Sequence, residues 1–592
     1  MSNISRRNFL RSAGIGALGV VGAGGLAACA PQTSGSTGTD DSTSSVGNLS
    51  ETGTGATWRT APEPIAEDRI VETYDCDVLV IGLGHAGCAA LRAAAEAGAK
   101  VCAMQETTEE TLTFKGGQVG HINSQYLKDK GVPEVDVVEF VNDWQLHSNN
   151  RSNTGLIMNY ARHAGECFDW LIEGSLSEEE KLNMHVTNLV EGGPYMHEFS
   201  GLKTWVGTAN LTEYVDRVLR NCIQMAVDAG GKVYWGTKAC QLITDANGRV
   251  TGAVGQGDGG YVRVNAAGGV ILATGGFGSN QEMREDLLYE ISERLDPDDE
   301  ISCMMDCDGS GIQMGYWVGG RIDPCVGTMD GVYWYPTDGP SDPIGATSAL
   351  WLNCDGKRYS NEGFGSTELQ SMTGAFQPKG AICTLFDDNI EEQIRAQAFG
   401  HLAIDHVRDG FDALRATLSK AYAGGAAGSA DAEAEMGGKA GSDKAAMASA
   451  VVFAADDFET LGTYLGYEGE ALSNFVASIE RYNELCEKGI DEDFGKDPSL
   501  LFPLKQPPYY GYAGVKQLGV LMVTVGGLLV DPDGMVLGQD YRPIQGLYAA
   551  GNASGGRFGW QYFTSIAGQS LSLAQTLGML AGQNAAKQAL GA

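Results

Sequence analysis

The sequence has few basic residues and lacks the cysteine spacings typical of metal or haem sites. Lysine and arginine total 40 against 75 acidic residues, which gives a formal net charge of −35. A surface of that sign repels nucleic-acid phosphates, so no nucleic-acid partner is expected. The 13 cysteines include no CxxC pair and no CxxCH, which argues against zinc ribbons, ferredoxin-type clusters and c-type haem. We therefore expect no metal site.

The apolar stretch near the N-terminus is too short and too rich in glycine for a permanent membrane span. The arginine pair in SRRNFL (residues 5–10) resembles the twin-arginine export signal, and the weakly apolar run 14–28 follows it. The segment LAAC, which ends at Cys29, resembles a lipobox, where cleavage leaves the cysteine free for lipid attachment. Residues 1–29 therefore predict an exported protein with a lipid anchor on the extracytoplasmic face of the cell membrane.

Length and composition indicate a globular protein of more than one domain. With 592 residues, 43% of them hydrophobic, the chain suits two or three domains. Residues 30–68 are rich in Ser, Thr, Gly and Asp without apolar periodicity, which predicts a flexible tether. The Ala- and Gly-rich residues 423–450 predict a low-complexity surface loop.

The strongest motif is a glycine-rich turn inside a βαβ unit. An apolar run at 76–81 predicts a buried strand, and the sequence GLGHAG follows it directly. A helix at 88–97 and a second strand at 101–104 complete the unit. Such glycines permit the tight turn, the approach of backbone to a pyrophosphate, and close helix–strand packing. The motif predicts a dinucleotide site, for FAD or for NAD, at these residues: Gly82, Gly84, Ala86 and Gly87.

The residue that ends the second strand departs from the usual pattern. An acidic side chain normally stands there and bonds the ribose hydroxyls. Here the position is Gln105, and Glu106 comes one residue later. An amide both donates and accepts hydrogen bonds, so either residue is a candidate for the ribose contact.

Four later segments resemble the fumarate-reductase-like FAD flavoproteins, the superfamily of flavocytochrome c and the succinate dehydrogenase flavoprotein. They are VILATGGFGSN at 270–280, DGKRYSNE at 355–362, RYN at 481–483 and GLYAAGN at 546–552. The motifs occur in the family's order and favour FAD over NAD. The resemblance implies an α/β fold in which a Rossmann-like FAD-binding domain is discontinuous and carries an inserted α+β capping domain. The implied boundaries are 69–325 and 500–592 for the FAD-binding domain and 326–499 for the cap.

The resemblance also implies FAD contacts beyond the glycine turn. They are Gly120, His121, Asn123, Ala273, Thr274, Gly275, Gly276, Gly551, Asn552, Gln569, Ser570 and Leu571. His121 aligns with a glycine of a flavin-contacting loop, and a purely structural histidine is an equal alternative. The histidine that bonds FAD covalently in respiratory complexes would fall near Phe114, so non-covalent FAD is expected.

The charged groups that clamp and protonate fumarate in the family are missing at the matching positions. The proton-donating arginine is replaced by Ser366, and two histidines are replaced by Tyr335 and Val523. The substrate-binding arginine falls in a stretch, 559–563, that holds aromatic residues instead. Such a wall suits a flat, largely uncharged substrate. As the acid that protonates the second carbon we expect Tyr562 first, then Tyr335, with Arg358 a weaker candidate.

These features together predict an exported FAD-dependent oxidoreductase that reduces an activated C=C bond of an aromatic or ring-enone substrate. The alternatives are the reverse desaturation, as in flavin ketosteroid dehydrogenases, and reduction of a fumarate-type carboxylate. A solute-binding lipoprotein without chemistry is a third, which the FAD motifs oppose. The chain shows no haem or FMN module, so an external donor is expected, either a quinol-linked cytochrome or a reduced flavin carrier.

Overall fold

The computed structural model describes eleven stretches of the chain, all within one unit, Thr54–Ala592. They are residues 56–199, 201–288, 302–303, 306–330, 347–364, 377–378, 381–397, 405–427, 451–516, 520–560 and 562–591. The export signal and the first part of the predicted tether lie outside them, as do Tyr335, Ser366 and most of the predicted loop 423–450.

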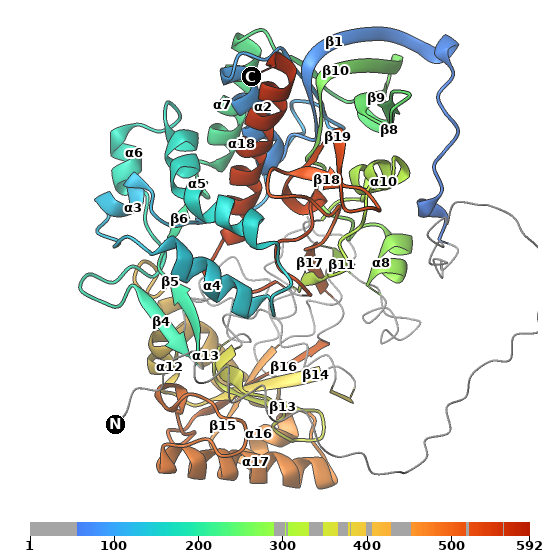
Figure 1. The fold of residues 1–592 in the computed structure, drawn as a ribbon. Coiled ribbons are helices and arrows are strands. Elements are labelled where there is room, and N and C mark those ends of the chain that lie inside the picture. The colour runs from blue at the N-terminus through green and yellow to red at the C-terminus, as the bar shows by residue number, and fades with distance from the viewer. Residues whose placement is uncertain are drawn as a thin grey trace, which may run out of the picture. The chain divides into compact units, whose positions relative to one another are not determined.

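The main sheet is built from both ends of the chain. Its strands run in the order β18-β19-β10-β1-β2-β7, and β8 and β9 extend it as an antiparallel pair beside β10 (Figure 1). The strands are β1 (Ile70–Ile81), β2 (Val101–Met104), β7 (Lys232–Tyr234), β8 (Lys238–Thr244), β9 (Val250–Gly257), β10 (Gly260–Leu272), β18 (Met535–Leu537) and β19 (Pro543–Ala549). Because β10 pairs in parallel with both β1 and β19, the sheet is discontinuous in sequence. The predicted α/β fold is confirmed.

Two helices that are far apart in sequence pack tightly against each other. Helix α2 (His85–Glu96) follows the glycine turn, and α18 (Gln569–Leu590) lies beside it (Figure 1). Gly578 and Gly582 make the close approach possible, because a Cβ on either would lie 2.2 or 2.3 Å from a carbonyl oxygen of α2. The packing brings the start of α18 to the glycine turn of the βαβ unit.

The remaining described segments before residue 331 and after residue 519 form helices and short paired strands. The helices are α3 (Gln125–Asp129), α4 (Val137–His147), α5 (Thr154–Ile172), α6 (Glu178–Asn183), α7 (Val215–Asp228), α8 (Gln281–Leu287) and α10 (Ser310–Trp317). The strands are β3 (Gln118–Gly120) with β6 (Thr208–Asn210), β4 (Met196–Phe199) with β5 (Leu202–Trp205), and β11 (Ser302–Cys303) with β17 (Val520–Thr524) and β12 (Thr328–Asp330).

A second, antiparallel sheet has its own hydrophobic core. Its strands run in the order β13-β14-β16-β15, and four helices accompany them in the sequence. The strands are β13 (Leu350–Asn353), β14 (Ala381–Phe386), β15 (Val451–Ala455) and β16 (Tyr509–Lys516), and the helices are α12 (Ile390–Ala396), α13 (Asp412–Gly424), α16 (Phe458–Tyr464) and α17 (Gly469–Lys488). This is the α+β composition expected of the cap. Strand β16 pairs with both β14 and β15 and so belongs to this sheet, although it follows the boundary that we expected at 499.

The predicted tether ends earlier than expected. Trp58 in a short 3₁₀ helix (Thr57–Arg59) is only 4% exposed. Its indole Nε1 donates to Asp286 at 2.9 Å, and the Trp317 indole donates to its carbonyl oxygen at 2.8 Å. Residues 56–59 are therefore docked on α8 and α10 rather than free. Within the described residues, no helix is both long enough and apolar enough to cross a bilayer.

Candidate FAD-binding and active site

A cavity of about 570 Å³ opens where the central strands of the main sheet end. Its walls come from the turn after β1, from residues 105–107 after β2, from residues 273–275 after β10, and from residues 550–552 after β19. Ser570 and Leu571 of α18 complete this side. The carboxyl ends of parallel strands are where doubly wound sheets bind dinucleotides.

The glycine turn is shaped for close approach to a ligand. Gly82 has φ +88°, a left-handed conformation that favours glycine. A Cβ on Gly87 would lie 1.8 Å from the carbonyl oxygen of Gly82, so only glycine lets helix and strand meet there. No side chain caps the N-terminus of α2 at Gly84, and a Cβ on Gly84 would meet nothing within 4 Å. The N–H groups at this end of α2 therefore border open cavity, which fits the pyrophosphate of a dinucleotide.

Both residues at the end of β2 line the cavity, and both already have partners. The Gln105 Oε1 accepts from the backbone N–H of Leu83 at 2.7 Å, so the amide supports the glycine turn. The Glu106 carboxylate pairs with the Lys238 Nζ at 2.9 Å. Either can face a ribose hydroxyl, so both remain candidates for that contact.

The ATGG segment is held in place by one buried carboxylate. The Asp306 side chain accepts from the N–H groups of Gly276 and Gly278 at 3.0 and 2.8 Å, and from the Thr524 hydroxyl at 2.7 Å. Burial raises the pKa of this carboxyl. The contacts tie residues 273–278 to β17, where Val523 lines the cavity. Gly276 itself supports the turn and does not line the cavity.

Of the predicted FAD contacts, most meet at this cavity. Those that line it are Gly82, Gly84, Ala86, Gln105, Glu106, Ala273, Thr274, Gly275, Gly551, Asn552, Ser570 and Leu571. Those that do not are Gly87, Gly120, His121, Asn123, Gly276 and Gln569.

The residues of the second group make contacts within the protein instead. His121 is fully buried, stacks on Phe168 at 4.1 Å and contacts the Ser124 hydroxyl through its Nε2 at 2.7 Å. Burial lowers the pKa of His121 to about 4, so the ring is neutral near pH 7. Asn123 donates to the Val135 carbonyl oxygen at 2.9 Å. A structural role therefore accounts for the contacts of the His121 ring with Phe168 and Ser124.

Gly120 and Gln569 shape the entry into α18. A Cβ on Gly120 would lie 2.2 Å from the Ala567 carbonyl oxygen. The Gln569 side chain accepts from the Ile566 N–H at 3.1 Å and donates to the Phe563 carbonyl oxygen at 2.6 Å. These bonds fix the turn that places Ser570 at the cavity.

Sequence reasoning missed a further set of cavity residues. They include Leu83, His85, Thr107, Thr111, Thr113, Phe114, Lys115, Thr237, Lys238, Ser279, Cys307, Asp308 and Ser310. His85 stands inside the glycine motif, so its position was a usable signal. Leu83 stands in the same motif and Ser279 in the ATGG segment, whereas the other residues come from segments with no recognised motif.

Tyr562 lies close to the cavity but is fully buried. Its ring packs on Phe558 with centroids 4.8 Å apart. Burial raises the pKa of its phenol well above 10, while a hydrogen bond from the backbone of Ser570 opposes the shift. The phenol therefore stays protonated at neutral pH, next to a residue that lines the cavity.

Arg557 is a buried arginine in the same segment as Tyr562, and the two side chains interact electrostatically. It is 0% exposed, its Nε donates to the Ser554 carbonyl oxygen at 3.0 Å, and its Nη2 donates to the Asn552 Oδ1 at 3.1 Å. Burial lowers its pKa to about 10, against the influence of Asp323. Because arginine only donates, this contact directs the Asn552 amide nitrogen away from Arg557.

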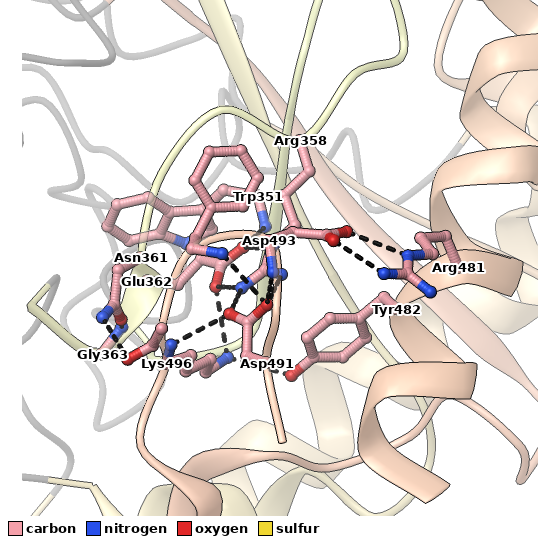
Figure 2. A network of polar contacts seen from close by, with 12 residues as sticks. Trp351, Arg358, Asn361, Glu362, Gly363, Arg481, Tyr482, Asp491, Asp493 and Lys496 are labelled. Carbon is pink, nitrogen blue, oxygen red and sulfur yellow. Dashed lines mark hydrogen bonds and ion pairs between the residues drawn. The ribbon is translucent and has the colours of Figure 1, made fainter. Parts of the chain in front are cut away.

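Arg358 sits in a buried ion-pair network that involves residues before and after helix α17 (Figure 2). Its Nε and Nη2 donate to the two oxygens of Glu362 at 2.7 and 2.8 Å. Its Nη1 and Nη2 donate to Asp491 at 2.9 and 2.7 Å. Lys496 approaches Glu362 at 3.5 Å and donates to the Tyr482 hydroxyl at 3.0 Å. Arg358 is not among the cavity residues.

Comparison with known families identifies the dinucleotide. Residues 77–566 match the profile of the family described as FAD binding domain. The chain belongs to this FAD-binding-domain family. Its cofactor is therefore FAD, and the NAD alternative left open by the glycine motif is removed. The glycine turn, the open N-terminus of α2 and residues 273–275 line the cavity that fits this cofactor.

Curated relatives of this FAD-binding-domain chain are oxidoreductases. It is 25% identical to the vinyl phenol reductase of Lactiplantibacillus plantarum over 529 residues, covering 86% of this chain and 96% of that protein. It is 27% identical to the urocanate reductase of Eggerthella lenta over 553 residues, covering 89% of this chain and 77% of that protein. The protein is accordingly an FAD-dependent oxidoreductase.

Solved structures agree on the fold. The 3-ketosteroid-Δ4-(5α)-dehydrogenase of Rhodococcus jostii superposes with a TM-score of 0.61 at 20% identity, covering 88% of this chain and 99% of that one. A flavocytochrome c3 fumarate reductase in an open conformation gives 0.55 at 20% identity, covering 90% and 82%.

Proposed function

We propose that the protein reduces an activated C=C bond of a largely uncharged substrate, such as an aromatic alkene or a ring enone. The observation that carries the proposal is the loss of charged groups at the positions where the family clamps a dicarboxylate. Ser366, Tyr335 and Val523 replace the family's arginine and histidines, and the stretch 559–563 holds aromatic residues; Val523 lines the cavity. A wall without charge favours the binding of a flat apolar substrate over the binding of a dicarboxylate.

The relatives support the reaction class. The named reductases act on vinyl phenols and on urocanate. When bound and reduced by an external donor, the FAD would supply a hydride to one carbon of the double bond. The other carbon then needs a proton from an acid within hydrogen-bond reach.

Among the described acid candidates, Tyr562 is the one we favour. Burial keeps its phenol protonated at neutral pH, and the backbone of Ser570, a cavity residue, partly opposes this rise in pKa. Arg358 remains the weaker candidate for the proton donor, because two carboxylates hold its guanidinium in a network that does not line the cavity. Tyr335 lies outside the described residues and stays the second candidate.

A second function is the reverse reaction, the desaturation of a ring beside a carbonyl. One curated relative is a 4-oxocyclohex-2-ene-1-carboxylate 5-dehydrogenase, 27% identical over 427 residues and 68% of this chain. The same uncharged wall would serve both directions, and the electron partner would decide between them.

The proposal is tested by anaerobic stopped-flow spectroscopy. The bound FAD is reduced with dithionite and mixed separately with a vinyl phenol, a ring enone, urocanate and fumarate. Fast reoxidation by one of the uncharged compounds is expected, and slow reoxidation by fumarate. Fast reoxidation by fumarate alone would assign the site to a dicarboxylate instead.

We further propose that the protein is exported and lipid-anchored, and that an external donor reduces it. The support is the order of arginine pair, apolar run and lipobox in residues 1–29. Arg6→Lys with Arg7→Lys should leave the precursor in the cytoplasm, and Cys29→Ala should release the protein from the membrane fraction. A processed Cys29→Ala protein that stays on the membrane would contradict the anchor.

A further inference from the structure

A single histidine joins three segments around the FAD cavity. His85 is the first residue of α2 and stands inside the glycine motif, where its side chain lines the cavity. Its Nε2 lies 3.0 Å from the Lys115 carbonyl oxygen. Its Nδ1 lies 3.0 Å from the Gln575 Nε2 on α18. The glycine turn, the segment before Gly116 and the C-terminal helix thus meet at one ring.

The two contacts determine which nitrogen carries the proton. A carbonyl oxygen can only accept, so Nε2 must be the protonated nitrogen that donates to Lys115. The unprotonated Nδ1 then accepts from the Gln575 amide, which must present its NH₂ group. Both bonds are satisfied at once by the neutral ring.

The surroundings keep the ring in that neutral state. His85 is 9% exposed, and burial lowers its pKa to about 4. Lys587 is the sole charged residue of α18, three turns beyond Gln575. On α2 the charged side chains are Arg92 and Glu96, which pair with each other at 2.7 Å. At neutral pH, then, His85 acts as a hydrogen-bonding group rather than as a charge.

The segment that His85 holds is itself part of the cavity wall. Residues 111–115 all line the cavity, in five consecutive positions. Arg220 of α7 holds the earlier part, because its Nη2 donates to the Leu112 carbonyl oxygen at 2.7 Å. The Gly117 carbonyl oxygen accepts from the Leu211 N–H at 2.7 Å and holds the part after it. His85 fixes the position between these two, at Lys115.

The third segment reaches His85 because α18 packs so closely on α2. A Cβ on Gly578 would lie 2.2 Å from the Ala86 carbonyl oxygen, one turn from Gln575. That glycine therefore sets the distance at which the Gln575 amide meets the imidazole.

We propose that His85 is a positioning residue that retains FAD by fastening the segment 111–115 over the cavity to α2 and α18. The glycines of the turn let the cofactor approach, and the histidine keeps the opposite wall closed on it. Its contribution should appear in the rate at which FAD leaves more than in the stability of the protein without FAD.

The test compares FAD release from the full-length protein and its variants at pH 7.5. His85→Phe keeps a ring of similar size and removes both hydrogen bonds, so FAD should dissociate about tenfold faster or more. Gln575→Leu removes only the bond from α18 and should give a smaller increase. His163→Phe is the matched control, because His163 is an exposed residue of α5 that pairs with Glu166. Release is followed as the rise of flavin fluorescence after dilution.

Two outcomes would overturn the proposal. One is FAD release at the wild-type rate from both His85→Phe and Gln575→Leu. The other is an equal loss of melting temperature with and without FAD, since that would show a general structural role. If His85→Phe does not fold, Gln575→Leu and His85→Gln decide by the same two criteria. His85→Gln keeps an N–H for the Lys115 carbonyl oxygen but loses the Nδ1 acceptor that the ring offers to Gln575, so FAD should leave this variant faster than it leaves the wild type.

Discussion

The Arg358 guanidinium donates two parallel hydrogen bonds, of 2.7 and 2.8 Å, to the carboxylate of Glu362, which lies four residues later in the chain. The carboxylate is fully buried and the arginine side chain is 6% exposed. Asp491 closes the other side of the guanidinium. The DGKRYSNE segment therefore contributes a buried ion-pair network beside the second sheet. The sequence alone had offered its arginine, Arg358, as a candidate proton donor.

Removal of Arg358 should destabilise that half strongly. Arg358→Met leaves the buried Asp491 carboxylate without its cation and Glu362 with Lys496 alone, which costs about 3–5 kcal/mol of unfolding free energy. Arg415→Met is the control, because its pair with Asp388 is 37% and 45% exposed and such pairs contribute about 1 kcal/mol or less. Urea unfolding followed by tryptophan fluorescence measures both. Equal, small losses would show that the buried network adds no stability.

FAD should be bound without a covalent link. Phe114 lines the cavity near the place where the covalent histidine of respiratory complexes would fall, and a phenyl ring forms no such bond. Acid precipitation should release all of the flavin into the supernatant. Flavin that stays with the precipitate would contradict this expectation.

The stability should fall as the pH drops from about 6.5 towards 4. Burial lowers the pKa of both His85 and His121 to about 4 from 6.5, so in this window the unfolded chain binds more protons than the folded one. Above pH 6.5 both states hold neutral rings and the effect vanishes. Each histidine contributes a slope of up to about 1.4 kcal/mol per pH unit. In His121→Phe, urea unfolding between pH 7 and 5 should show a shallower slope. An unchanged slope would mean that His121 is charged in the folded protein.

Tyr562→Phe should slow turnover by about 10²–10⁴-fold, the usual contribution of a general acid. The substitution removes only the hydroxyl from a fully buried ring, so FAD content should be retained. Reduction of the flavin by an artificial donor should keep its wild-type rate. If Tyr562→Phe is fully active and Tyr335→Phe is slow, the proton comes from Tyr335.

The sequence was sufficient for the parts of the site that lie on local motifs. Gly82 and Gly84 were predicted because turn geometry and phosphate approach restrict the residue types at those positions, and the ATGG segment was predicted from its resemblance to a known family. Lys115 and Lys238 were not, because they reach the cavity through strand order and helix packing that no local pattern records. Strand β16 was missed as part of the second sheet for the same reason, since its pairing partners lie more than fifty residues earlier.

Two further differences have local causes. Trp58 was assigned to the tether because its neighbours are polar and glycine-rich, yet its ring is buried against Tyr316 at 5.2 Å. His121 and Gln569 were predicted to contact FAD, but both are fully buried and neither lines the cavity. In such cases the motif identifies the neighbourhood, while side-chain packing decides which residue faces the ligand.

The most direct test of the account is the identity of the product. The protein is supplied anaerobically with an excess of reduced donor and an equal mixture of a ring enone, a vinyl phenol and fumarate, and the products are analysed by mass spectrometry. The account predicts that the enone or the vinyl phenol gains two hydrogens across its C=C bond while fumarate remains unreduced. Succinate as the main product, or no saturated product at all, would contradict it.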